Sequence, residues 1–171
     1  MTSAGAPLIL TLQLDERSSA FFDAQRRRYF PPARNFIPAH LTLFHALPGE
    51  HLVTIQQDLE RSIACRHPFP LDVTGLRSLG RGVAYTLRSA ELADLRRSLA
   101  ATWIDWLKPQ DRQNHQPHVT VQNKVDPTQA RALLEELGDG FKPFRVEGMG
   151  LELWWYRGGP WEKVRSFGFI A

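Results

Sequence analysis

Cysteine is almost absent from the sequence: among 171 residues, Cys65 stands alone. A single cysteine can neither close a disulfide within the chain nor supply a zinc site built on cysteines. The sequence also lacks a run of about 18 apolar residues, the length that a membrane-spanning helix needs. Its longest apolar candidate, residues 7–14, contains Thr11 and Gln13 and follows no basic residue, so it does not fit a signal peptide. Without a leader or a disulfide, we expect a protein of the reducing cytoplasm that does not associate with membranes.

The composition is that of a folded, globular chain with a small excess of positive charge. Hydrophobic residues make up 43% and charged residues 23%, which excludes an intrinsically disordered chain. A length of 171 residues fits one domain, or two small lobes that share a core. Lysine and arginine together number 21 against 18 acidic residues, for a net charge of +3. This excess is compatible with an anionic partner but does not by itself indicate nucleic-acid binding.

Hydrophobic periodicity predicts an alternation of strands and helices. Apolar residues spaced by three and four predict amphipathic helices over residues 18–29, 52–63, 92–106 and 127–137. Prolines and glycines cluster between the periodic segments, where turns are expected. Short segments of β-compatible residues predict strands over residues 8–14, 40–46, 69–79, 83–87, 119–125, 144–156 and 161–170.

The order of these elements repeats along the chain. The run helix, strand, helix, strand, strand occurs over roughly residues 15–87 and again over roughly residues 91–170. Helices interleaved with hairpins predict an α+β fold with mainly antiparallel sheets. We therefore expect a single domain over residues 1–171, made of two pseudo-symmetric lobes with flanking helices and an active cleft between them.

Each repeat contains the same short pattern in its first strand: histidine, an apolar residue, threonine and a second apolar residue. The two copies are HLTL at residues 40–43 and HVTV at residues 118–121. Because side chains alternate between faces in a strand, each histidine shares a face with its threonine. The aliphatic residues point to the opposite face, toward the core. Each strand is thus expected to line a groove with its polar face.

Two histidines on either side of a phosphorus atom can supply both proton transfers of an in-line displacement. Imidazole titrates at about pH 6.5, so one ring can accept a proton from the attacking group while the other protonates the leaving oxygen. Threonine hydroxyls can donate to the non-bridging phosphate oxygens. We therefore predict that His40 and His118 are the catalytic pair and that Thr42 and Thr120 bind phosphate, with no metal ion and no cofactor. Cleavage of a cyclic phosphodiester suits this arrangement.

Three further side chains are candidates for substrate binding. Phe44 and Lys124 continue the alternation of the two motifs, so Phe44 is expected to line the groove or stack on a base and Lys124 to reach a phosphate. Arg34, which precedes the first motif, is a candidate for steering an anionic ligand. Ordinary packing or a surface position explains each of these residues as well. The basic run at residues 26–28 is expected to be a solvated helix face.

A metal site is the competing interpretation of the histidines. His115 and His118 are three residues apart, and His45 is a third candidate ligand. The segment around Pro117 is not helical, so this spacing does not place the two rings on one face. No carboxylate lies within the motif to complete a site. We therefore expect no metal ion here.

The paired motifs resemble those of the 2H phosphoesterase superfamily, also called 2′-5′ RNA ligase-like proteins. Residues 38–44, PAHLTLF, are similar to the first motif of that family, and residues 116–121, QPHVTV, to its second. The resemblance extends to the order of elements over nearly the whole chain. It implies a bilobal α+β fold and action on the 2′,3′-cyclic phosphate ends of RNA or related cyclic nucleotides, with 2′-5′ joining of RNA ends in reverse. It also assigns the acid–base roles to the two histidines and phosphate binding to the two threonines singled out above.

The sequence leaves two questions open. Its pseudo-symmetry makes the two histidines interchangeable, and as a hypothesis we assign water activation to His118 and leaving-group protonation to His40. The alternatives to this enzyme are a metal-dependent hydrolase and a non-catalytic module that binds RNA or nucleotides on the same scaffold, although pure binding needs no matched acid and base. The expected ligands are RNA ends or small cyclic nucleotides, and no obligate protein partner is indicated.

Overall fold

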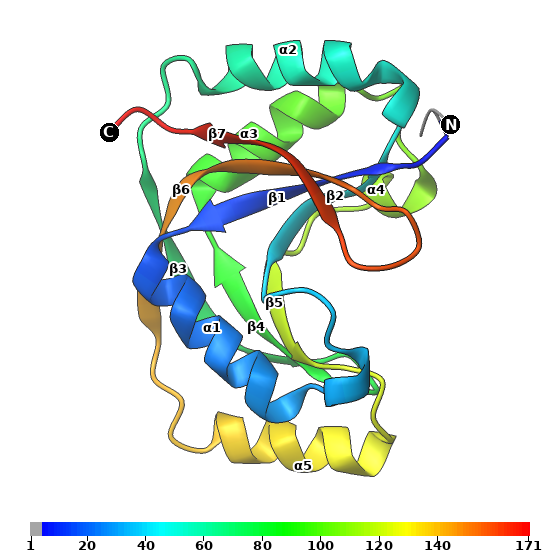
Figure 1. Ribbon diagram of the computed structural model, residues 1–171. Helices are drawn as coiled ribbons and strands as arrows, with labels where there is room; N and C mark the ends of the chain where they lie inside the picture. Colours follow the sequence, from blue (N-terminus) through cyan, green and yellow to red (C-terminus); the bar gives the residue numbers. More distant parts are fainter. Residues whose placement is uncertain (1–4) are drawn as a thin grey trace.

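A computed structural model describes residues 5–171, in which helices surround an antiparallel sheet (Figure 1). In chain order the elements are β1 (Leu8–Leu14), α1 (Glu16–Tyr29), β2 (Leu41–Leu47), α2 (Leu52–Ile63), β3 (Phe69–Ser78), β4 (Val83–Arg88), α3 (Ala90–Thr102), α4 (Pro109–Arg112), β5 (His118–Gln122), α5 (Pro127–Gly138), β6 (Phe144–Trp155) and β7 (Glu162–Gly168). Single 3₁₀ turns, Pro32–Arg34 and Gly49–His51, flank β2. The short helix α4 is the one α-helix in the described part that periodicity did not predict. No helix in this part is long and apolar enough to cross a bilayer.

The strands form one sheet, and β6 joins its two parts. Neighbours follow the order β2-β1-β6-β3-β4-β5, and β7 pairs with β6 beside this path. The 12-residue β6 pairs with β1 through residues 148–155 and with β3 through residues 144–148. The α+β fold with antiparallel pairing is therefore confirmed, with strands from both sequence repeats in a single sheet. The division into two lobes stays a prediction.

The strands that carry the histidine motifs, β2 and β5, are the first and last of this order, and they lie side by side (Figure 1). Their Cα atoms approach to within 8 Å, although no hydrogen-bonded ladder joins them. The sheet therefore curls until its two ends face each other. This curvature brings together motifs that begin at residues 40 and 118.

Different helices cover the two ends of the molecule. Helices α1 and α5 pack along β3, β4 and β5, whereas α2 and α3 lie together at the opposite end (Figure 1). Helix α1 begins after Asp15, whose carboxylate accepts the backbone N–H of Ser18 at 3.1 Å as an N-cap. Phe22 of α1 is buried and packs edge-on against Tyr85 of β4, with ring centroids 5.5 Å apart. The Phe22–Tyr85 contact holds α1 against β4, and α1 also packs on β5, which carries the second motif.

Candidate active site

His40 and His118 occupy equivalent places at the starts of their strands. Nδ1 of His40 lies 2.9 Å from the carbonyl oxygen of Pro38, and Nδ1 of His118 lies 2.8 Å from the carbonyl oxygen of Gln116. Because a carbonyl oxygen can only accept, each Nδ1 carries the proton and donates it. In the neutral rings Nε2 therefore keeps its lone pair. Both histidines are set up to accept or return a proton through Nε2.

Burial lowers the pKa of both histidines. The pKa of His40 is lowered to about 4, mainly by burial; the Pro38 carbonyl opposes this shift, and the positive charges of Arg26 and His118 add to it. Trp161 covers His40, with ring centroids 4.5 Å apart. Burial also lowers the pKa of His118, with a smaller contribution from the charge of Arg77. Both imidazoles are therefore mostly neutral in the free protein at pH 7.

A β-bulge falls at the last residue of each motif. In β2 the register shifts between Thr42 and Phe44, and in β5 it shifts between Thr120 and Gln122. One extra residue in a strand reverses the alternation of side chains beyond it. Phe44 and Gln122 are accordingly buried, at 0% and 3% exposure.

The expectation that Phe44 lines the groove is thus wrong. Its ring packs edge-on against Trp103, with centroids 5.2 Å apart, and the guanidinium of Arg96 lies 4.2 Å from its centre. The prediction assumed an unbroken strand, and the bulge breaks it. The next residue, His45, is exposed and takes the outward position instead.

Side chains hydrogen-bond the backbone of both motif strands. Nε2 of His115 donates to the carbonyl of Thr42 at 2.9 Å, and Nη1 of Arg26 donates to the carbonyl of Thr120 at 3.1 Å. His115 lies just before β5 and hydrogen-bonds β2, whereas Arg26 lies before β2 and hydrogen-bonds β5. Each motif strand is thus anchored by a side chain from the segment that precedes the other. Arg26 is only 5% exposed. The expected solvated face at residues 26–28 is therefore wrong for Arg26, because its side chain turns inward while its two neighbours stay exposed.

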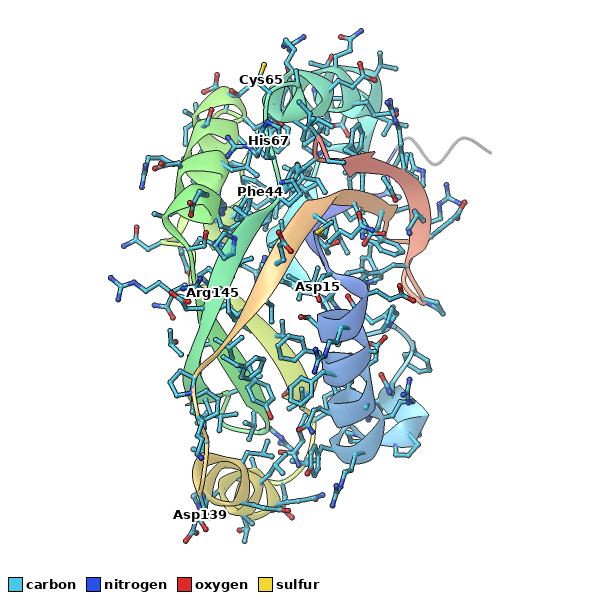
Figure 2. All side chains as sticks on the ribbon, turned by 90° about the vertical axis from the view of Figure 1, so that its left-hand side faces the viewer. Asp15, Phe44, Cys65, His67, Asp139 and Arg145 are labelled. Carbon is cyan, nitrogen blue, oxygen red and sulfur yellow. The ribbon has the colours of Figure 1, made fainter. Side chains whose placement is uncertain are left out.

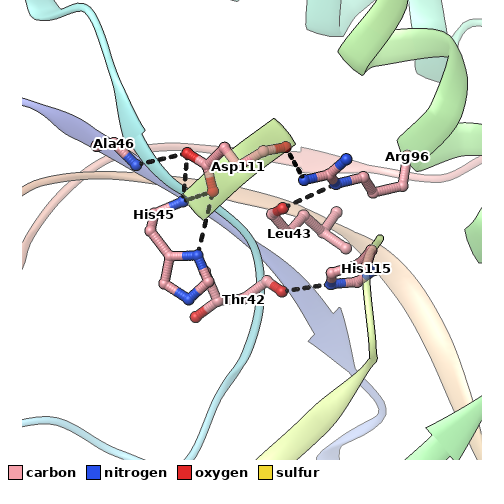
Figure 3. Close-up of polar contacts among 7 residues, drawn as sticks. All are labelled: Thr42, Leu43, His45, Ala46, Arg96, Asp111 and His115. Atoms are coloured by element: carbon pink, nitrogen blue, oxygen red, sulfur yellow. Dashed lines mark hydrogen bonds and ion pairs between the residues drawn. The ribbon is translucent and has the colours of Figure 1, made fainter. Parts of the chain in front are cut away.

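Asp111 of α4 holds the far end of β2 (Figure 3). Its carboxylate is 1% exposed and accepts the backbone N–H groups of His45 and Ala46, at 2.9 and 3.0 Å. It also accepts a hydrogen bond from Nδ1 of His45 at 3.2 Å. Burial raises the pKa of this carboxyl, but the hydrogen bonds from His45 and Ala46 outweigh that effect, so its pKa is lowered overall. No motif in the sequence marks Asp111, which lies 66 residues from its partner His45.

Two cavities open beside the motif histidines. The His40 cavity, of about 290 Å³, is lined by His40, Trp161 and residues of α1, β1 and β6. The His118 cavity, of about 350 Å³, is lined by His118, Thr42 and Arg77 together with the segment before β5. The structure therefore places His118 and Thr42 in one cavity and His40 in the other. Thr120 is half-buried on β5 and is not among the residues that line either cavity.

A third cavity borders the other two. This cationic cavity, of about 480 Å³, is lined by Arg26, Arg34 and Lys124 together with His45 and Trp161. It shares Trp161 with the His40 cavity and His45 with the His118 cavity. The structure thus brings together Arg34 and Lys124, two candidates that are far apart in the sequence.

The histidines proposed as alternative metal ligands make other bonds. Nε2 of His115 and Nδ1 of His45 are hydrogen-bonded to Thr42 and Asp111, respectively. Across residues 5–171, no three His, Cys, Asp or Glu side chains are gathered in a group that could hold a metal ion.

The chain was compared with known protein families and structures, and both comparisons found similar proteins. A model of the 2′-5′ RNA ligase superfamily matches residues 14–160. The crystal structure of TT0787 of Thermus thermophilus gives a TM-score of 0.67 at 16% identity, covering 95% of this chain and 97% of that one. E. coli LigT complexed with ATP gives 0.60 at 17% identity, and LigT complexed with phosphate gives 0.56 at 18% identity; each alignment covers 99% of this chain and 100% of LigT. At these identities the structural matches describe the fold alone. A search of curated proteins gave no match.

Proposed function

The chain belongs to the 2′-5′ RNA ligase superfamily, and from this premise we propose that it is a metal-independent phosphodiesterase that opens cyclic phosphodiesters, such as the 2′,3′-cyclic phosphate ends of RNA or cyclic nucleotides. Membership of this superfamily supports a phosphoesterase-type enzyme whose ligands are RNA or nucleotides. The observation that carries the finer proposal is the matched pair of histidines, each with Nδ1 bound to a carbonyl and Nε2 left for proton transfer.

In the proposed reaction, water attacks the phosphorus of a 2′,3′-cyclic phosphate. One neutral histidine takes a proton from the water through Nε2 as the new P–O bond forms. The P–O3′ bond breaks on the opposite side, and the second, protonated histidine gives its proton to O3′. The products are a 2′-phosphate and a free 3′-hydroxyl. The hydroxyl of Thr42, which lines the His118 cavity, donates to a non-bridging oxygen, where negative charge increases in the transition state. Thr120, two residues after His118 on β5, is proposed as the second donor.

The surroundings of the two histidines support the reverse of the role assignment suggested by the sequence. His40 is covered by Trp161 and repelled by the charge of Arg26, so its pKa falls to about 4 and it holds a proton poorly. The pKa of His118 is lowered to a lesser extent. In the free enzyme the more basic ring retains the proton, so we assign the acid role to His118 and the base role to His40.

The same two groups serve ligation when the 5′-hydroxyl of another RNA replaces water as the nucleophile. His40 then takes the proton of that hydroxyl, and His118 protonates O3′ as the ring opens, which leaves a 2′-5′ linkage and a free 3′-hydroxyl. Cleavage of this linkage runs the same steps backwards with the two roles exchanged, by microscopic reversibility. A 2′-5′ ligation activity is therefore part of the proposal, with the 2′,3′-cyclic end and the 5′-hydroxyl end as substrates.

A substrate panel tests the activity. The purified protein is incubated with the four nucleoside 2′,3′-cyclic phosphates and with an RNA oligonucleotide that ends in a 2′,3′-cyclic phosphate, with and without EDTA. We expect turnover to the 2′-phosphate isomer, unchanged by the chelator. Loss of activity in EDTA would instead support the metal-dependent hydrolase, and tight binding without turnover of any member would support the non-catalytic module.

The leaving group tests the two roles. A diester with a very good leaving group, such as bis(p-nitrophenyl) phosphate, needs little protonation of that group. We expect His118→Ala to be much less impaired on this substrate than on a cyclic nucleotide, whereas His40→Ala stays impaired on both. The opposite pattern would restore the assignment suggested by the sequence.

A further inference from the structure

Three of the side chains that line the cationic cavity carry positive charge. Arg26, Arg34 and Lys124 line it, and none of its described lining residues is an aspartate or a glutamate. At about 480 Å³ it falls within the size range of ligand pockets. Asp23, whose negative charge acts on Arg26, lines the His40 cavity instead. Three cations with no acidic residue in the described lining favour an anionic ligand over a neutral one.

Arg26 is held in a fixed orientation within this cavity. Its Nε donates to Oδ1 of Asn35 at 2.9 Å, and its Nη1 donates to the carbonyl of Thr120 at 3.1 Å. The guanidinium also lies over the ring of Phe30, 4.0 Å from the centroid. Its other terminal nitrogen, Nη2, makes no hydrogen bond to the described residues. A planar donor that is already ordered binds a phosphate oxygen with little further loss of side-chain entropy.

Lys124 and Arg34 reach the cavity from two constrained turns. Lys124 has φ 64°, in the left-handed region, which is strained for a residue other than glycine. Oδ1 of Asn123 stabilises this turn by accepting the Lys124 backbone N–H at 2.9 Å. Arg34 ends the 3₁₀ turn Pro32–Arg34, where proline fixes the backbone. Both cations are thus positioned by local backbone structure at the edge of the cavity.

The cationic cavity adjoins the cavities of both catalytic histidines and contains aromatic surface. It shares His45 as a lining residue with the His118 cavity and Trp161 with the His40 cavity. Phe36, 62% exposed, and Tyr156 also line it. Exposed rings beside cations are typical of surfaces that stack a nucleobase next to a phosphate.

We propose that this cavity is a subsite for a second phosphate of the substrate, the one attached to the 5′-oxygen of the nucleotide whose cyclic phosphate is opened. The inference rests on the proposed function and narrows its substrate class. The preferred substrate carries a 5′-phosphate in addition to the cyclic phosphate, either as a terminal 5′-phosphate on a mononucleotide or as the internucleotide phosphate of an RNA chain. A nucleoside 2′,3′-cyclic phosphate without it leaves the subsite empty and binds more weakly.

Binding of product analogues tests the subsite independently of turnover. Dissociation constants are measured by calorimetry for adenosine 2′-phosphate, for adenosine 2′,5′-bisphosphate, and for a diadenosine dinucleotide that ends in a 2′-phosphate. The wild-type protein is expected to bind at least one of the two ligands with the additional phosphate about tenfold more tightly than adenosine 2′-phosphate. Preference for the bisphosphate identifies a terminal 5′-phosphate as the source, and preference for the dinucleotide identifies an RNA chain.

Matched double variants complete the test. Arg34→Gln combined with Lys124→Gln removes two charges from the cavity, and Arg27→Gln combined with Arg131→Gln removes two exposed charges from α1 and α5, away from all three cavities. The first pair is expected to abolish the tenfold preference and the second pair to preserve it. No preference in the wild-type protein, or an equal loss in both pairs, would overturn the subsite. Failure of the proposed function has a different signature, because the preference would persist in a protein that turns over no cyclic phosphate.

Discussion

Asp111 and His45 form a hydrogen-bonded pair at the end of β2, with Oδ1 of the buried carboxylate 3.2 Å from Nδ1 of the exposed ring. The same carboxylate accepts two backbone N–H groups of β2. Because a carboxylate accepts from Nδ1, the neutral His45 ring keeps its lone pair on Nε2, as His40 and His118 do. One buried acid therefore fixes both the strand and the orientation of a third imidazole between the His118 cavity and the cationic cavity.

Asp111→Asn is expected to destabilise the fold by about 1–3 kcal/mol at pH 7, because an amide replaces a buried acceptor of several N–H groups. The pKa of Asp111 is lowered from 3.8 in the folded protein. Its stabilising contribution is therefore fully present above pH 3.8 and is lost as the pH falls through the folded-state pKa. Urea unfolding at pH 7 and near pH 3 measures both effects, and the difference between wild type and variant should shrink in acid.

Asp94→Asn is the matched control for this measurement. Asp94 pairs with Arg97 on the exposed surface of α3, so its replacement should change the free energy of unfolding by about 0.5 kcal/mol or less. Equal losses in the two variants would contradict a special role for the Asp111 carboxylate.

The pH dependence of kcat/KM should be bell-shaped with its maximum on the acid side of pH 6.5. Burial lowers the pKa of the base, His40, to about 4 and lowers the pKa of the acid, His118, below 6.5. The productive form, with His40 neutral and His118 protonated, is therefore most populated above the pKa of His40 and below the lowered pKa of His118. Rates on a cyclic nucleotide from pH 3.5 to 9 provide the measurement. A maximum above pH 7 would show that the free enzyme does not hold its histidines in this state.

Phe44→Ala is expected to lower the free energy of unfolding by about 3–5 kcal/mol, because it empties a fully buried aromatic position. Phe36→Ala is its natural comparison, since Phe36 is exposed and its removal leaves the core intact. Denaturant unfolding measures the loss of stability in each variant, and the loss should be much larger for Phe44→Ala. A small loss of unfolding free energy for Phe44→Ala, together with a large change in substrate binding, would show that Phe44 lines the groove after all.

The periodic features of this protein could be predicted from its sequence, and its long-range contacts could not. The two His-x-Thr strands, the helices around them and the α+β class follow from local alternation and spacing, which depend on near neighbours. The bulges after Thr42 and Thr120 leave no such signature, so the alternation placed Phe44 on the wrong face. Arg26 looks like part of a solvated basic run because its partner, the Thr120 carbonyl, is 94 residues away. Contacts of this kind depend on how the sheet curls, which no local pattern encodes.

The most direct test of the two-histidine mechanism is kcat/KM on a 2′,3′-cyclic substrate for His40→Ala, His118→Ala and the double variant. His67→Ala is the control, because His67 lines none of the three cavities. It lies near Cys65, at the end of the molecule opposite Asp139 (Figure 2). Each single variant is expected to lose about 10²–10⁴-fold with unchanged thermal unfolding, and the double variant to lose little more, because the two rings act as one unit. Wild-type turnover in either single variant, or a loss that His67→Ala reproduces, would contradict the mechanism.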